Sequence, residues 1–307
     1  FLDQVEQKVF AIKEGSEVQG ELKAKDLIGE VLEIIEQFAA GERGMQGIPT
    51  GYPDLDSMGG GMKPGEMFII AARPSMGKTS FMMNIVEHIA VDLGKPSLVF
   101  SCEMSALQIV QRLLFARAKF PLSNLKPGFQ LTRGELQRIQ TASKELMDAP
   151  LSIGDVRAKA RRKKRDEDIQ FIAIDYLQLM RSKSRQAESS REREIAEISA
   201  GLKAIAKELQ IPIMVLAQLN RGPEQRGGTP RMSVLREPGS IEQDADMIGL
   251  LYRQEYYADS EEEREESGGI AELVVAKNRN GPTGNVPLTF IKELMRFESS
   301  DRRVDPE

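Results

Sequence analysis

The chain has 307 residues, 40% hydrophobic and 29% charged, a composition typical of a globular protein rather than a disordered or collagen-like one. Its single cysteine, Cys102, excludes an internal disulfide and fits a reducing compartment, and with one histidine, His88, a Cys/His zinc site is nearly excluded. The net charge of −5, taken alone, argues against a non-specific nucleic-acid binder, and no apolar run reaches the roughly 18 residues that span a bilayer.

The first forty residues are expected to be helical and separate from the rest. Apolar residues recur at three- and four-residue spacing over 2–12 and again over 27–38, with a glycine-flanked break between them. The second stretch carries a wide apolar stripe, which must be buried on its own domain or on a neighbouring subunit. Residues 41–65 are rich in Gly and Pro and are expected to be mostly turns.

Beyond residue 65, strands are expected to alternate with helices. Helical stretches are predicted over 79–91, 105–119, 133–147, 156–165 and 191–209, and capping boxes begin two of them at Ser105 and Thr132. Short apolar runs predict strands at Met67–Ala71, Ser97–Ser101, Phe171–Ile174, Ile213–Ala217, Met247–Leu251 and Ala271–Ala276. The alternation predicts an α/β fold with a mostly parallel sheet flanked by helices on both faces.

The most specific motif is Ala72-Arg-Pro-Ser-Met-Gly77-Lys78-Thr79, which follows a predicted strand and opens a predicted helix. It fits the P-loop pattern G-x-x-x-x-G-K-[ST] except that Ala72 replaces the first glycine, and this costs little where φ is negative. Lys78 would reach the β- and γ-phosphates of ATP, and the Thr79 hydroxyl would bind Mg²⁺. The residues expected to hold the nucleotide here are Ser75, Met76, Gly77, Lys78, Thr79 and Ser80.

Three polar residues end or follow other predicted strands, at the edge where parallel sheets bind ligands. Asp175 closes Phe171-Ile-Ala-Ile and is the expected second acid for Mg²⁺, although an Asp can simply cap a strand. Glu103 is the candidate for activating water, the alternative being a first-turn Glu stabilised by a helix dipole. Gln218 is the candidate for sensing the γ-phosphate, the alternative being a polar cap at a strand end.

Several segments together resemble the DnaB-type replicative DNA helicases of bacteria or phages, from about residue 21 to about residue 300. The matching segments are Gly47-Ile-Pro-Thr-Gly51 with Leu55-Asp56, the P-loop, Ser101-Cys-Glu-Met-Ser105, Ile174-Asp-Tyr-Leu-Gln-Leu179, residues 236–246 and residues 276–284. Between Leu151 and Lys159 this sequence is several residues shorter than is usual in the family.

The resemblance implies a RecA-like ATPase working as a ring-shaped homo-hexamer that moves 5′ to 3′ on single-stranded DNA at the fork, in the cytoplasm of a bacterial or phage-infected cell. It implies that residues 1–20 are a remnant of an N-terminal domain and linker, 21–42 a linker helix docking on the next subunit, and 43–307 the motor domain. A primase and a helicase loader are the implied partners.

The resemblance also assigns residues that the chemistry alone leaves open. Lys277 and Arg279 match the basic pair that reaches a neighbour's γ-phosphate, and Arg112 matches an arginine near the nucleotide; both could otherwise be solvated surface positions. The implied DNA contacts are Arg236, Glu237 and Gly239 in the loop 220–240, with Arg185 in the polar loop 181–193 as a second candidate.

Charge distribution bears on the same expectation. The basic run Lys159–Arg165 is interpreted as a solvated helix face balanced by the acids that follow it. Acids concentrate in the linker stretch and at 261–266, whereas arginines gather in the loops 181–193 and 220–240. A ring that encloses its DNA strand could therefore hold it despite the negative net charge. Two alternatives stay open: a RecA-like recombinase or ring ATPase that remodels without unwinding, and a nucleotide-dependent assembly factor.

Overall fold

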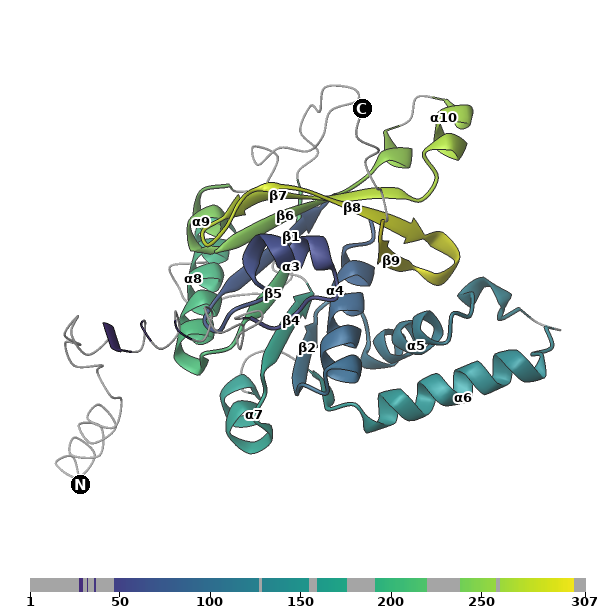
Figure 1. Cartoon of the computed structure of the whole chain (residues 1–307), viewed down its shortest axis with the longest axis horizontal. Coiled ribbons are helices and arrows are strands. Elements are labelled where there is room, and N and C mark those ends of the chain that lie inside the picture. Colours follow the sequence, from purple (N-terminus) through teal and green to yellow (C-terminus); the bar gives the residue numbers. More distant parts are fainter. Residues whose placement is uncertain are drawn as a thin grey trace. The chain divides into compact units, whose positions relative to one another are not determined.

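The computed structural model describes residues 28–29, 32, 36, 47–126, 129–154, 159–175, 191–219, 238–257 and 260–300. The chain divides into two compact units, Phe1–Gly44 and Met45–Glu307. In the first unit the described residues are helical, and the side chains of Ile28 and Leu32 are exposed. The helix predicted over 2–12 lies outside the described residues. The second unit contains a sheet and its covering helices (Figure 1).

Among the described residues, nine strands form one sheet in the order β3-β2-β4-β5-β1-β6-β7-β8-β9. The pairs from β3 to β6 are parallel, and β7, β8 and β9 extend the sheet as antiparallel neighbours. The strands are β1 (Met67–Ala72), β2 (Ser97–Ser101), β3 (Leu151–Gly154), β4 (Phe171–Asp175), β5 (Ile213–Gln218), β6 (Met247–Arg253), β7 (Ile270–Asn278), β8 (Gly284–Ile291) and β9 (Arg296–Ser299).

All six predicted strands are present, and the mostly parallel sheet is confirmed. The strand predicted at Ala271–Ala276 lies within β7, which runs antiparallel to β6. The described residues between 254 and 269 hold only short helical segments, whereas a parallel return would need a crossover on the sheet face. The strands β3, β8 and β9 were not predicted.

The helices lie on both faces of the sheet (Figure 1). Alternate residues of β1 point to opposite faces: Phe68 and Ile70 pack in a core with α3, α4 and α5, and Met67 and Ile69 pack in a core with α8 and α9. The helices are α3 (Pro53–Gly59), α4 (Lys78–Glu87), α5 (Ala106–Arg117), α6 (Arg133–Asp148), α7 (Lys159–Glu167), α8 (Arg191–Leu209), α9 (Pro238–Asp244) and α10 (Glu261–Glu266), with short π or 3-10 turns η1 (His88–Asp92), η2 (Leu122–Asn124), η6 (Gln254–Tyr256) and η7 (Lys292–Leu294).

The local signals for helix boundaries agree with the structure where it describes them. Both capping boxes are formed, at Ser105 with Gln108 and at Thr132 with Glu135. The expectation of turns over 41–65 misses α3, which has Pro53 in its first turn and a left-handed Gly60 after its end.

The basic helix α7 carries ion pairs that agree with a solvated, charge-balanced face. Lys163 pairs with Glu167, Lys164 with Asp168 and Arg165 with Asp166, all of them at least partly exposed. Within the described ranges, the structure holds no helix of the length and apolar character that crossing a membrane requires.

Candidate functional site

The polar residues predicted at strand ends share one edge of the sheet. Strands β2, β4, β5 and β1 are consecutive neighbours and run parallel, so their carboxyl ends lie side by side. The P-loop follows β1, Asp175 ends β4 and Gln218 ends β5. In the register of β2 with β4, Ser101 is opposite Asp175, which places Glu103 beside that carboxylate. The fold therefore brings together four groups that lie far apart in sequence.

The P-loop backbone is held in a conformation that glycine allows and other residues resist. Gly77, the N-cap of α4, has φ 90°, and a Cβ there would lie 2.9 Å from Cε2 of Phe297 on β9. Ser75 also has a positive φ, 67°, which is uncommon for a residue with a side chain. Met76 is buried in the core, so only its backbone can face a ligand.

Asp175 is the most buried acid of the site, with 1% of its surface exposed. Its Oδ2 accepts a hydrogen bond of 2.9 Å from the Thr79 hydroxyl, whereas its buried Oδ1 has no hydrogen-bond partner among the described residues. Burial raises the pKa of Asp175, the Thr79 bond opposes that rise, and the Glu103 charge adds to it. An unsatisfied buried carboxylate oxygen beside a P-loop threonine fits a site for a hydrated divalent cation.

Lys78 lies beside the same acids. Burial lowers its pKa, while the charges of Asp175 and Glu103 oppose that change. Both carboxylates are therefore near enough to favour the charged ammonium that a triphosphate needs. Glu103 itself is exposed and comes two residues before Ser105, the N-cap of α5. The alternative interpretation of Glu103 as a first-turn residue of that helix is therefore wrong.

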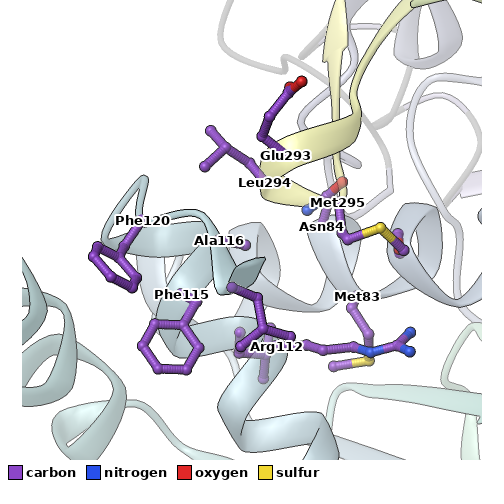
Figure 2. Close-up of a pocket in the computed structure, with 12 residues that line it drawn as sticks. Met83, Asn84, Arg112, Phe115, Ala116, Phe120, Glu293, Leu294 and Met295 are labelled. Carbon is purple, nitrogen blue, oxygen red and sulfur yellow. The ribbon is translucent and has the colours of Figure 1, made fainter. Parts of the chain in front are cut away.

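Arg112 extends from α5 past Met83 of α4 (Figure 2), and it lines a small, mostly apolar pocket with residues of η7. Its charge lowers the pKa of Asp175, so it lies close to the acid end of the site. Gln218 is partly buried at the end of β5 and pairs in register with Ala72, the first P-loop residue. Arg112, from α5, and Gln218, from the end of β5, therefore both border the candidate site.

Two residues that were not predicted from the sequence, Arg253 of β6 and Tyr256 of η6, bind the P-loop backbone. The Ser75 carbonyl accepts hydrogen bonds from the Arg253 guanidinium at 3.3 Å and from the Tyr256 hydroxyl at 2.9 Å. Arg253 is buried, with its guanidinium carbon 3.9 Å from the ring centre of Phe290. An arginine at the end of an apolar strand was the available signal, because a cation there must find a buried partner.

Lys277 and Arg279 lie at the end of β7 and contact the end of α9 in the same chain. Lys277 Nζ donates to the carbonyls of Ala245, at 2.7 Å, and Glu242. Arg279 donates to the Gln243 carbonyl and faces Asp246. Burial, and next the charge of Arg279, lowers the pKa of Lys277.

The candidate DNA contacts are mostly outside the structure described. Arg185, Arg236 and Glu237 lie outside the described residues, and Gly239 belongs to the first turn of α9. Among the described residues, no group of three or more His, Cys, Asp or Glu side chains forms a metal-binding cluster.

Comparisons with known proteins agree with this geometry. The family described as "DnaB-like helicase C terminal domain" matches residues 47–299. The replicative DNA helicase DnaB of Geobacillus stearothermophilus is 39% identical over 99% of this chain and 68% of its own. A solved structure described as an ATPase domain superposes with a TM-score of 0.79 at 34% identity, covering 89% of this chain and 99% of that one. A solved DnaB-like replicative helicase, described with its interactions with primase, gives a TM-score of 0.79 at 32% identity, covering 96% of this chain and 73% of that one.

Proposed function

The chain belongs to the DnaB-like helicase family and is an ATP-dependent replicative DNA helicase with a RecA-like fold, and from that premise we propose which residues carry the reaction. The observation that carries the proposal is the Thr79–Asp175 hydrogen bond, with an unpartnered Asp175 oxygen beside Lys78. These groups come from two segments far apart in sequence, the P-loop and the end of β4, and meet at the edge where parallel sheets bind nucleotides.

The nucleotide site is formed by Ser75–Ser80, Asp175 and Arg112. Backbone N–H groups at the start of α4 bind phosphate oxygens, helped by the positive end of the helix dipole. Lys78 neutralises the β- and γ-phosphates, and Asp175 with Thr79 would hold Mg²⁺ and its water shell. The ion would supply neutralisation of the charge that develops on the transferred phosphoryl group.

Glu103 accepts the proton of the attacking water. Its carboxylate is exposed next to Asp175 and Lys78, so water reaches it, while Lys78 binds the phosphates and Asp175 would hold the metal ion. Gln218, at the end of the strand between β4 and β1, senses the γ-phosphate and passes its state into the segment 220–240 that follows it.

The remaining parts act between subunits. Lys277 and Arg279 reach the γ-phosphate of a neighbouring subunit, which requires an assembly of several subunits, proposed to be a ring-shaped homo-hexamer. Residues 43–307 form the motor domain, 21–42 a linker helix that docks on the neighbour, and 1–20 a remnant of the N-terminal part. Single-stranded DNA passes through the ring, contacted by Arg236, Glu237, Gly239 and Arg185, with 5′ to 3′ movement.

A primase and a helicase loader are the proposed partners, in a bacterial or phage-infected cytoplasm. Support for primase is that a DnaB-like helicase of similar structure is described with its interactions with primase. The absence of an aromatic residue in 220–240 favours contacts that follow the DNA backbone without sequence preference.

The test is Glu103→Gln in the intact helicase. Removing a positioned proton acceptor is expected to lower ATP turnover by about 10²- to 10⁴-fold and to abolish unwinding, while ATP still binds. Glu261→Gln on α10, also an exposed glutamate, is the matched control and should leave turnover unchanged. Wild-type turnover in Glu103→Gln would assign proton acceptance to another group.

A further inference from the structure

Lys277 belongs to β7 and Arg279 directly follows its last residue, and both side chains are directed to the end of α9. The residue between them points the other way: the Asn278 side-chain amide donates to the carbonyls of Met58, at 3.1 Å, and Pro282, at 3.0 Å. These two bonds fix the strand end to α3 and to its own hairpin turn. The face that carries the two cations therefore has a defined direction, toward α9.

The carboxyl end of α9 provides the acceptors for both cations. The last carbonyls of a helix have no partner within the helix and carry the negative end of its dipole. Lys277 binds the carbonyls of Glu242 and Ala245, and Arg279 binds that of Gln243. In Figure 1, α9 lies against β6 and β7 at this end of the sheet.

Asp246, two residues after the end of α9, is the only carboxylate that the described structure places in bonding contact with Arg279, and it is 8% exposed. Its Oδ2 accepts the Met67 N–H at 2.7 Å and an ion pair from Lys203 of α8. Its Oδ1 faces Arg279 Nη1 at 3.5 Å, and its carbonyl accepts the Arg279 backbone N–H at 2.9 Å. The side chain of Asp246 is thus fixed from two directions before it meets the arginine.

The Arg279 side chain is bonded to the protein but remains exposed to solvent. Its side chain is 46% exposed, while one guanidinium nitrogen faces Asp246 and the other binds Gln243. A guanidinium has five N–H donors, so others remain for a phosphate. An exposed arginine that is already fixed loses less side-chain freedom when it meets its target than a solvated one does.

We infer that Asp246, held by Lys203 and the Met67 N–H, is a positioning residue that sets the guanidinium of Arg279 for the neighbouring subunit's nucleotide. The inference rests on the proposed role of Arg279 between subunits. It differs from a structural role, in which Asp246 only joins α8 to β1 through Lys203 and Met67. A positioning role predicts that the effect of Asp246 on catalysis passes through Arg279.

The experiment is a double-mutant cycle in the intact helicase, with labelled ATP to register residual hydrolysis. Asp246→Asn keeps an acceptor for the Met67 N–H but removes the charge that faces Arg279. It is expected to lower kcat about 10- to 100-fold, as small misplacements of catalytic groups do, with little change in KM for ATP. In an Arg279→Ala background, the same substitution should lower kcat no further. Asp244→Asn, an acid two residues earlier with no bond to Arg279 in the described structure, is the control and should have a much smaller effect.

The possible results separate the inference from the function on which it rests. If Arg279→Ala leaves kcat unchanged, the shared site fails and the inference fails with it. If Arg279→Ala lowers kcat but the two effects multiply, or if Asp246→Asn alone has no effect on kcat, Asp246 is structural and only the inference is overturned. Thermal melting of each variant accompanies the kinetics, and Asp246→Ser, which also keeps an acceptor, enters the same cycle if Asp246→Asn does not fold.

Discussion

Asp175→Asn tests whether the nucleotide site is held at a cost to the stability of the nucleotide-free protein. The wild-type carboxylate is buried, and its Oδ1 has no hydrogen-bond partner among the described residues. Asparagine has nearly the same shape and can still accept the Thr79 hydroxyl. Its NH₂ group then takes the place of Oδ1 and also lacks a partner, but it carries no charge. We therefore expect the nucleotide-free variant to be more stable than the wild type, and inactive.

The size of the effect follows from the contacts. An unsatisfied buried acceptor costs about 1–3 kcal/mol, more when charged. The substitution also removes the attraction between Asp175 and Lys78 and weakens the bond from Thr79, so a net gain of about 1 kcal/mol is expected. For a domain of about 150–250 residues, 1 kcal/mol corresponds to a rise in Tm of roughly 2–4 °C.

The pH dependence has a defined sign. Burial raises the pKa of Asp175, so the folded protein binds its proton at pH values where the unfolded chain has released it. Wild-type stability from this group therefore falls as pH rises from the unfolded value of about 3.9 through the raised pKa. The advantage of Asp175→Asn should be full above that raised pKa and should shrink as the pH falls through it.

Differential scanning fluorimetry with and without Mg-ATP is the measurement. Saturating ligand should raise the Tm of the wild type, since a ligand concentration of about 100 times Kd adds about 2.7 kcal/mol, and should barely move Asp175→Asn. Asp56→Asn is the matched control: Asp56 is also buried, but Thr50 donates three hydrogen bonds to it, so this variant should lose stability. A lower Tm for nucleotide-free Asp175→Asn would refute the reasoning and show that the carboxylate stabilises the empty site.

Three further substitutions have definite expectations. Gly77→Ala places a Cβ against Phe297 at a positive φ, so nucleotide binding measured by calorimetry should be lost together with some stability. Arg253→Met removes a donor to the Ser75 carbonyl and should raise KM for ATP more than it lowers kcat. An unchanged KM would mean that the P-loop keeps its conformation without this hydrogen bond. Arg117→Met leaves the buried Glu87 with one cation fewer and should cost about 1–3 kcal/mol in urea unfolding with no change in KM.

Much of the parallel part of the sheet was predictable because its strands are buried on both faces and appear as continuous apolar runs. The strand Phe171–Asp175 is an example: every residue is buried, and its carboxyl end is marked by an acid. The antiparallel edge was harder to recognise. Strand β8 alternates buried and exposed residues and includes Pro287, so its sequence lacks the continuous apolar signal.

The P-loop lysine and threonine, with the acid at the end of β4, were predictable because a fixed local pattern and a sheet edge determine where they meet. The support of the loop was not. Phe297 of β9 fills the space beside Gly77, and Arg253 of β6 donates to the Ser75 carbonyl. Both residues belong to segments far from the P-loop along the chain. Contacts of that kind depend on strand order, which no local spacing encodes.

The pair Lys277 and Arg279 shows why pattern and geometry answer different questions. The resemblance to the family assigns both residues to a neighbour's phosphate. The sequence alone, two basic residues around an asparagine, fits a solvated strand end equally well. The structure adds that both are already bonded to the carbonyls of one short helix, next to a buried acid that is itself held by β1 and α8. Met67 begins β1 and the P-loop follows the other end of that strand, so the same acid connects the strand that leads into one nucleotide site to the arginine proposed to act on the next. If that connection matters, disturbing Asp246 should alter hydrolysis at the neighbouring site before it alters nucleotide binding at its own.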